Sequence, residues 1–350
     1  MFFPTKTFTV ESVTSGHPDK ICDQISDAIL DECLRQDSSS RVAVEAFGSH
    51  GTLVIGGEVT TKATVDYPKI ARDLYRKIGY QDELEIISRI VQQSPDIAQG
   101  VDTGGAGDQG MMYGYATSET PEFLPLPVVL VHKLARRLET VRREDPKFWW
   151  LGPDGKTQIT CRNGLIDTVL ISCQHDSSID NEKINSAIRE KVISRIIGDI
   201  TNLKILVNPS GAFTIGGFKA DTGLTGRKIM VDTYCGLVPH GGGCFSGKDA
   251  TKVDRSGAYM ARYVAKQVVA KGMADECLVS VAYAIGRAEP VMVEAHDSKG
   301  NNLSDYVEKN FDFRPMAIID QLGLRNPIFL KTASYGHFGK AGLPWEETSI

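Results

Sequence analysis

Short strand-like and helix-like segments alternate along the whole chain, and this alternation restricts the possible folds more than any other feature. Residues 5–13 alternate polar with apolar side chains, and residues 41–47 and 52–61 are rich in β-branched side chains, as strands are. Residues 67–78 and 252–271 have the periodicity of helices. Strands and helices without a strict βαβ repeat indicate an α+β fold, or several small sheets covered by helices. We also expect helices at residues 125–141 and about 182–197, and strands at residues 166–172, 204–207, 229–234 and 278–285.

Composition excludes several classes of protein. The chain has 350 residues, which favours two or three domains, and a formal net charge of −5, which disfavours a dedicated nucleic-acid binder. Its most apolar stretch, residues 123–131, is far shorter than the about 20 residues of a membrane span. The start has no extended apolar segment of an export signal, and the 7 cysteines form no CxxC pair. We therefore expect a cytoplasmic protein with reduced thiols, without membrane or nucleic-acid partners.

A helix is expected to start at Pro18 and Asp19 and to carry a row of acidic side chains. Asp23, Asp27 and Asp31 recur at four-residue spacing, opposite an isoleucine-rich face. The row permits a metal site, but we interpret it as a solvated helix face.

Two glycine-rich segments resemble nucleotide-binding motifs only in part. Residues 105–110 match GxGxxG, but a loop-like stretch precedes them where a dinucleotide site needs a strand. Residues 242–249 match GxxxxGK, but Asp249 follows where a P-loop needs Ser or Thr, and no strand leads directly into the motif. The first segment indicates a backbone that is flexible or approaches something closely, with a plain glycine-rich surface loop as the alternative. Glycine amides and a lysine that cradle phosphate fit the second segment.

Cations gather where a helix is expected to begin. Lys248, Lys252 and Arg255 flank that start, and Arg227 and Lys228 lie just upstream. A helix N-terminus is already positive, so added cations are unfavourable unless an anion offsets them. A polyphosphate ligand explains the cluster, and a basic surface patch is the alternative.

Other polar residues leave two interpretations open. Asp19 can be a helix cap or a metal ligand, and Glu45 either faces the core with a cation or faces solvent. His132 and His175 lack ligand spacing, so we expect structural roles. The chain has no GxSxG, HExxH or CxxC motif, which fits a reaction whose substrate supplies the nucleophile.

Seven motifs, in order and nearly end to end, resemble the S-adenosylmethionine synthetase (methionine adenosyltransferase) family. They are GHPDK (16–20), GAGDQG (105–110), GLTGRKI (223–229), GGGCFSGKD (241–249), KVDRSGAY (252–259), YAIGRAEP (283–290) and YGHFG (335–339). The resemblance implies attack of the methionine sulfur on ribose C5′ of ATP, release of triphosphate, and its cleavage to pyrophosphate and phosphate. A neutral thioether needs no general base, so alignment and charge stabilisation on the triphosphate dominate the barrier.

The resemblance also assigns roles to individual residues. The implied catalytic residues are His17, Lys156, Arg227 and Lys248. The implied ATP-binding residues are these four with Asp154, Phe213 (stacked on adenine), Asp221, Lys228 and Cys244, the last without chemistry of its own. The implied methionine-binding residues are Glu58, Gln99, Asp108, Asp221 and Lys252. Two Mg²⁺ per site are expected on Asp19, Glu11 and Asp254, and K⁺ on Glu45.

Two departures from the family pattern have expected consequences. Ala212 stands just before the adenine-stacking Phe213, where the family usually has arginine, so one cationic contact is lost. The loop between Gln99 and Gly107 is shorter than usual. Because this segment gates the site in the family, we expect a poorer lid, with altered access or tolerance of methionine analogues.

The implied architecture is α+β, with three related sheet-and-helix units around a pseudo-threefold axis. We place the units at residues 5–100, 105–214 and 216–341, and expect that they can interleave in space. The family forms homodimers with active sites between subunits, and tetramers are common. The alternatives are a P-loop-like NTPase or phosphotransferase, and a non-catalytic ATP-binding subunit.

Overall fold

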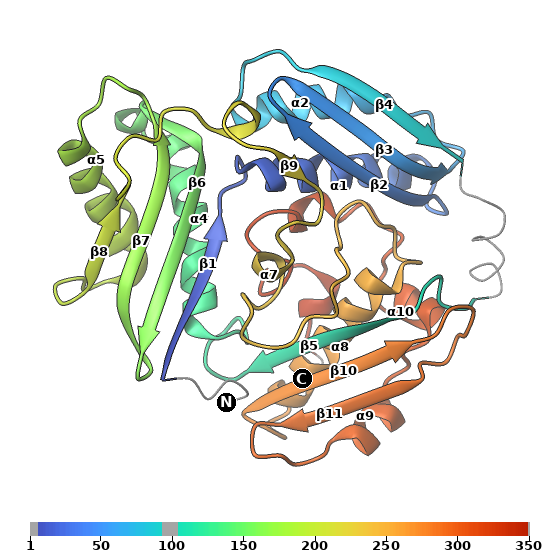
Figure 1. The fold of residues 1–350 in the computed structure, drawn as a ribbon. Coiled ribbons are helices and arrows are strands. Elements are labelled where there is room, and N and C mark those ends of the chain that lie inside the picture. Colours follow the sequence, from blue (N-terminus) through green and yellow to red (C-terminus); the bar gives the residue numbers. More distant parts are fainter. Residues whose placement is uncertain (1–5, 93–103, 349–350) are drawn as a thin grey trace.

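Three β-sheets surround the centre of the molecule in the computed structural model, which describes residues 6–92 and 104–348 (Figure 1). Helices accompany every sheet, and the loops that follow residue 217 run through the centre. The prediction of an α+β fold with several helix-covered sheets is confirmed.

The first sheet contains four strands in the order β4-β3-β2-β9. Its elements are β2 (Arg41–Ser49), β3 (Thr52–Thr60), β4 (Glu85–Val91) and β9 (Gly223–Leu224), with helices α1 (Pro18–Gln36) and α2 (Tyr67–Ile78). β3 pairs antiparallel with β2 and parallel with β4. Helix α1 packs on β2 and on α2, and it lies between this sheet and the central loops (Figure 1).

The second sheet has the order β1-β6-β7-β8. Its elements are β1 (Thr7–Val13), β6 (Leu151–Arg162), β7 (Leu165–His175) and β8 (Lys204–Val207), with helices α4 (Leu126–Glu144), α5 (Asn181–Ile188) and α6 (Ser194–Ile197). Helix α4 packs on β1 and β6. The helix expected at about 182–197 contains a π-helical turn, Arg189–Ile193, between α5 and α6.

The third sheet has the order β11-β10-β5. Its elements are β5 (Gly110–Thr117), β10 (Glu276–Tyr283) and β11 (Met292–Asp297), with helices α8 (Val253–Ala270), α9 (Ser304–Asn310) and α10 (Pro315–Gln321). The remaining short helices are Pro146–Phe148, Gly217–Lys219, α7 (Ile229–Asp232), Leu330–Thr332 and Pro344–Glu346. Helix α8 packs on both β5 and β10.

Each sheet contains one strand from a distant part of the sequence. β1 pairs with β6 in the second sheet, β5 pairs with β10 in the third, and β9 pairs with β2 in the first. The chain therefore crosses repeatedly between the sheets, and these crossings bring residues near 17, 156 and 227 into one region.

Local signals explain why some predicted elements are correct and one is wrong. Helix α2 has the predicted bounds because the Asp66 side chain accepts a hydrogen bond from Lys69 N, and Gly79, at φ 131°, ends the helix. The strand expected at 229–234 is instead α7 and a turn, in which Cys235 N donates to Met230 O. A short apolar run does not distinguish these structures by its periodicity.

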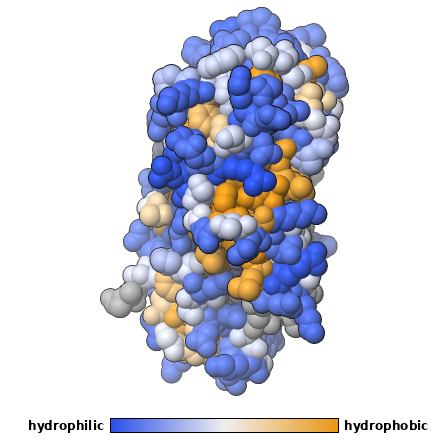
Figure 2. Space-filling model, turned by 90° about the vertical axis from the view of Figure 1, so that its left-hand side faces the viewer, coloured by the Kyte–Doolittle hydropathy of each residue, from blue (hydrophilic) through white to orange (hydrophobic). Residues whose placement is uncertain are grey.

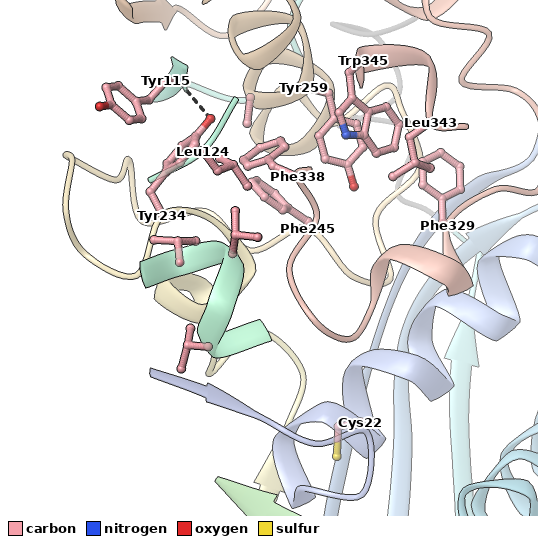
Figure 3. Packing of buried hydrophobic residues seen from close by; sticks show 14 of the residues in the cluster. Cys22, Tyr115, Leu124, Tyr234, Phe245, Tyr259, Phe329, Phe338, Leu343 and Trp345 are labelled. Carbon is pink, nitrogen blue, oxygen red and sulfur yellow. Dashed lines mark hydrogen bonds between the residues drawn. The ribbon is translucent and has the colours of Figure 1, made fainter. Parts of the chain in front are cut away.

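An aromatic cluster anchors α8 to the C-terminal segment and to the central loops (Figure 3). Tyr259 stacks on Trp345, with ring centroids 3.8 Å apart, and Phe245 contacts Tyr259 edge-on. Figure 3 shows Phe245 and Phe338 side by side between Tyr234 and Tyr259. The loop that carries Phe245 is therefore fixed by a packed core.

The side of the molecule that carries α5 and β8 is hydrophilic over most of its surface, with an apolar patch near its middle (Figure 2). In the part of the chain that the structure describes, no helix is both long and apolar enough to cross a membrane.

Candidate active site

His17 caps the N-terminus of α1 and is held as a neutral side chain. Its Nδ1 accepts a hydrogen bond from Asp19 N at 3.2 Å. Burial and the charge of Lys228 lower the pKa of His17 to about 3. A neutral imidazole whose Nδ1 accepts carries its proton on Nε2. His17 can therefore donate a hydrogen bond from Nε2 to an oxyanion.

Asp19 is fully buried and pairs with two cationic side chains from a loop far away in sequence. Its Oδ1 accepts a hydrogen bond from Leu224 N at 3.0 Å and forms an ion pair with Arg227 Nε at 2.9 Å, and its Oδ2 accepts from Lys228 Nζ at 2.5 Å. Burial opposes ionisation, but the hydrogen bonds from Lys228 and Leu224 hold the pKa of Asp19 below its usual value. His17, rather than Asp19, caps the helix. We call His17, Asp19, Arg227 and Lys228 the α1 cluster.

Two predicted residues of β6, Lys156 and Asp154, lie near the α1 cluster. Lys156 is exposed on β6, and its charge contributes to the lowered pKa of His17. Asp154 is buried; its Oδ2 accepts from Gly217 N at 2.9 Å, but its Oδ1 has no hydrogen-bond partner among the described residues. Burial raises the pKa of Asp154 to about 6. Phe213 is half-buried next to His175, and Asp221 is exposed.

A second group of predicted residues lies around the start of α8. Lys248 Nζ lies 2.5 Å from Asp254 Oδ2, and both side chains are about one-fifth exposed. Cys244 is half-buried and lies close enough to Lys248, Glu45 and Asp254 for their charges to influence its pKa, which burial raises. We call Glu45, Cys244, Lys248 and Asp254 the α8 cluster.

The two clusters meet at Gly226, which precedes Arg227 and has a φ of +83°. A Cβ atom at this position would lie 2.5 Å from the Cβ of Cys244. Only glycine permits this close approach with a left-handed backbone. The two loops that carry most of the predicted phosphate-binding cations therefore touch each other here.

Carboxylates of the same chain already balance the cations at the start of α8. Arg255 and Asp27 form a fully buried pair, and Lys252 Nζ lies 2.5 Å from Asp249 Oδ2. Charge at the helix start therefore does not by itself require a ligand at Arg255.

The expectation of a solvated acidic face on α1 is wrong. Asp23, Asp27 and Asp31 are all buried, because their partners come from loops far away in sequence. Lys20 Nζ donates to Asp23, Arg255 pairs with Asp27, and Asp31 accepts two backbone N–H groups. Sequence analysis missed this buried acidic row; the only signal for it was the strict four-residue spacing.

Glu45 lies at the exposed edge of the α8 cluster, and several other predicted residues lie outside both clusters. Glu45 is exposed, so it faces solvent rather than the core, and it shares a groove of about 500 Å³ with Glu58 on β2 and β3. Asp108 and Glu11 are also exposed. Gln99 and most of the loop between Gln99 and Gly107 lie outside the described residues. A larger cavity of about 590 Å³ beside β11 and α9 contains none of the predicted residues, so cavity size does not identify the site.

Within the described residues, no group of three or more His, Cys, Asp or Glu side chains lies together as a metal site. Asp19 and Asp254 each bind a lysine instead. Any metal held by these carboxylates would therefore need further ligands from water, a substrate or another subunit.

The two motifs that resemble nucleotide-binding sequences do not lie in the required contexts. Residues 105–110 lead into strand β5, whereas a dinucleotide site needs a helix there. No strand immediately precedes residues 242–249, and α8 begins only at Val253. The topology is therefore not that of a P-loop.

Residues expected to be structural do have structural contacts. His132 is buried, with its Nδ1 2.8 Å from Ser12 Oγ. His175 Nε2 accepts from Phe213 N at 3.1 Å. All 7 cysteines are free thiols.

Comparison with known proteins finds matching family models along most of the chain. Three models of S-adenosylmethionine synthetase match: the N-terminal domain at residues 5–95, the central domain at 103–213 and the C-terminal domain at 215–347. Together they cover nearly the whole chain.

Curated relatives are similar over their full lengths. The S-adenosylmethionine synthase of Pseudothermotoga lettingae is 52% identical, over 96% of this chain and 94% of the relative. Those of Desulforudis audaxviator and Mesoplasma florum are 51% and 50% identical, over 97% and 98% of this chain and 95% and 97% of the relatives. From the three matching models and these identities, the chain belongs to the S-adenosylmethionine synthetase family.

Proposed function

We propose that this chain forms S-adenosylmethionine from ATP and L-methionine and then hydrolyses the released triphosphate, with the α1 cluster as the triphosphate site. The observation that carries this assignment is the convergence of Arg227 and Lys228 on buried Asp19, beside a neutral His17 at a helix N-terminus. Cations and a positive helix end in one place favour an anion with several charges.

The reaction needs charge stabilisation more than proton transfer. The methionine sulfur attacks ribose C5′ and the C5′–O bond breaks, so negative charge grows on the triphosphate. His17 donates from Nε2 to the bridging oxygen that leaves. Lys156, Arg227 and Lys228 contact the phosphate oxygens from one side, and Lys248 contacts them from the other. Donors fixed before the reaction stabilise the developing charge without reorganisation.

Metal ions would add to this stabilisation. Mg²⁺ commonly takes one or two carboxylates and completes its coordination with water and substrate phosphates. Asp19, Glu11 and Asp254 would supply oxygen ligands of that kind for two Mg²⁺ ions, and exposed Glu45 would supply one for K⁺. Bound Mg²⁺ would neutralise charge on the phosphate oxygens.

The remaining predicted residues would bind the ends of the two substrates. Phe213 would stack on adenine, with Asp154 presenting its free Oδ1 and Cys244 lining the pocket; Ala212 adds no charge there. The methionine-binding residues in this proposal are Glu58, Gln99, Asp108, Asp221 and Lys252. We also propose that the shorter loop between Gln99 and Gly107 alters the access of substrates to the site.

We propose that a second copy of the chain completes each site. Glu45 and Glu58 lie exposed in the β2–β3 groove, and Glu11 and Asp108 are exposed as well. A homodimer that faces these residues toward a partner's α1 cluster would bring together the substrate and metal ligands. The proposal also includes the assembly of dimers into tetramers and a cytoplasmic location. It places the boundaries between the three sheet-and-helix units near residues 100 and 215.

One assay tests the function. The full-length protein is incubated with ATP, methionine, Mg²⁺ and K⁺, and the products are identified by mass spectrometry. We expect a sulfonium product with pyrophosphate and phosphate. ADP would support an NTPase or phosphotransferase, and unchanged ATP would support a non-catalytic subunit.

Lys248→Ala tests the α8 cluster in the same assay. Turnover should collapse while the circular dichroism spectrum is unchanged, because one lysine that contacts the leaving triphosphate is lost. Unchanged turnover would remove Lys248 from the mechanism.

A further inference from the structure

Four aspartates along one side of α1 hold segments far away in sequence, and the first three, Asp19, Asp23 and Asp27, hold the loops beside the proposed site. Each accepts backbone N–H groups from a loop far away in sequence. The pairs are Asp19 with Leu224 N, Asp23 with Gly226 N, Asp27 with Gly247 N, and Asp31 with Phe329 N and Leu330 N. Charged acceptors make strong hydrogen bonds, so α1 acts as a template for these loops.

Asp23 occupies a special place in this row because it holds Gly226. Its Oδ1 accepts from Gly226 N at 2.8 Å, and its Oδ2 accepts from Lys20 Nζ, also at 2.8 Å. Lys20 in turn donates to Asp232 at 2.5 Å. Lys20 and Asp23 have no exposed side-chain surface, so the ion pair is inaccessible and the Asp23 carboxylate cannot contact a substrate.

Gly226 is the point where the two cation-bearing loops touch. Arg227 and Lys228 follow it directly, and its free α-carbon face lies against Cys244. A shift of the Gly226 amide would therefore move Arg227 and Lys228 and, through the contact with Cys244, the loop that leads to Lys248.

We propose that Asp23 is a positioning residue for the triphosphate site: its hydrogen bond to Gly226 N sets how the 223–228 loop lies against the 241–248 loop. This inference rests on the proposed function. It predicts that loss of the acceptor lowers kcat for S-adenosylmethionine formation and for hydrolysis of added tripolyphosphate, and leaves the KM for methionine unchanged.

A matched pair of double variants isolates the acceptor from the buried charges. The two variants are Lys20→Met/Asp23→Asn and Lys20→Met/Asp23→Leu. Both lack the Lys20–Asp23 ion pair, and their side chains at position 23 are of similar size. Only the asparagine offers an oxygen to Gly226 N. We expect kcat of the asparagine variant to exceed that of the leucine variant by about a hundredfold, the effect of displacing a catalytic group by about 1 Å.

The same exchange at Asp31 is the control, because Asp31 holds residues 329–330 rather than a cation-bearing loop. Asp31→Asn and Asp31→Leu should differ in melting temperature but not in kcat. Equal kcat in the two Lys20→Met variants, or an equally large kcat difference in the Asp31 pair, overturns the proposal. If the wild-type protein forms no S-adenosylmethionine, the proposed function fails instead.

A measurement on the wild-type protein covers the case in which the variants do not fold. Hydrogen exchange is followed by mass spectrometry on peptides that span residues 223–228, with no ligand present. We expect protection comparable to that of helix α1, because Asp23 holds the Gly226 amide before substrate binds. Exchange as fast as in a solvent-exposed loop overturns the proposal.

Discussion

Two arginines pair with aspartates of helix α1, and they differ in how many of their hydrogen-bond donors they use within the protein. The Arg255 guanidinium binds both oxygens of Asp27, the carbonyls of Phe245 and Lys248, and two hydroxyl groups, and it has no exposed surface. Arg227 makes one contact with Asp19 and one with Thr222 O, and its side chain is 45% exposed.

This difference separates structural cations from those available to a ligand. A guanidinium has five N–H donors, and Arg255 uses all three of its nitrogens within the protein. Arg227 keeps donors free and accessible. Sequence position near a glycine-rich loop does not distinguish the two arginines; the number of partners and the exposure do.

The largest expected effect is on stability at the buried pair. Arg255→Ala leaves the Asp27 carboxylate buried without its cation, so the free energy of unfolding should fall by about 3–5 kcal/mol. Chemical denaturation followed by circular dichroism measures the loss. Arg255→Met/Asp27→Leu removes both charges and should recover part of it. A loss in Arg255→Ala no greater than in Arg227→Ala would contradict the comparison.

The pair of half-exposed Arg227 with buried Asp19 should show the opposite behaviour. Arg227→Ala should lower kcat by about 10²–10³-fold, because a donor to the transition-state charge is lost. Its unfolding free energy should change by no more than about 1 kcal/mol, because buried Asp19 keeps its hydrogen bonds from Lys228 and Leu224 N. Product assays and denaturation measure the two quantities. Arg195→Ala, an exposed arginine on α6, is the control and should change neither.

A glycine pair tests the contact between the two cation-bearing loops. Gly226 and Gly242 have φ values of +83° and +95°, so alanine costs roughly 1–2 kcal/mol of backbone strain at either position. Only at Gly226 would the new Cβ also collide with Cys244, whereas it meets nothing within 4 Å at Gly242. Denaturation should show the larger loss for Gly226→Ala, and equal losses would argue against close packing of the loops.

The smallest effect is a pH dependence at the far end of the aspartate row. Burial raises the pKa of Asp31 to about 6, above its unfolded value. The native state therefore binds this proton more tightly, and the Asp31 contribution to the unfolding free energy grows as pH falls from 6 toward 4. Asp31→Asn lacks this contribution. Between pH 6 and pH 4, its unfolding free energy should therefore increase less than that of the wild-type protein, by about 1 kcal/mol per pH unit.

An exposed aspartate provides the control for that titration. The hydrogen bond from Lys69 lowers the pKa of Asp73, so its stabilising contribution is present above its unfolded pKa and disappears as pH falls. Asp73→Asn should therefore change the pH dependence with the opposite sign. The same sign in both variants would contradict the assignment of the Asp31 effect to burial.

Elements whose signals are local were predictable from sequence. The side chain of Asp66 and the backbone of Gly79 define both ends of α2, so its bounds could be read directly. The 229–234 segment was not predictable in this way, because Asp232 is buried against Lys20, 212 residues away, and such partners leave no local pattern.

The site shows the same limit. Residue types and glycine loops indicated a polyphosphate ligand, but Asp19 and Lys228 are 209 residues apart, and only the family resemblance brought them together. The acidic row on α1 was misinterpreted for the same reason: helical periodicity shows which residues share a face, but not which loop covers that face.

The exchange of strands between the three sheets also constrains how the molecule can be made. The first sheet receives its last strand, β9, only when residues 223–224 have been synthesised, and β1 waits for residues 151–162 before it can pair. Nascent fragments therefore expose unpaired strand edges on the ribosome, and contacts of such long sequence separation slow folding. We therefore expect that no contiguous third of the chain folds by itself, and that the three sheets are completed only late in translation.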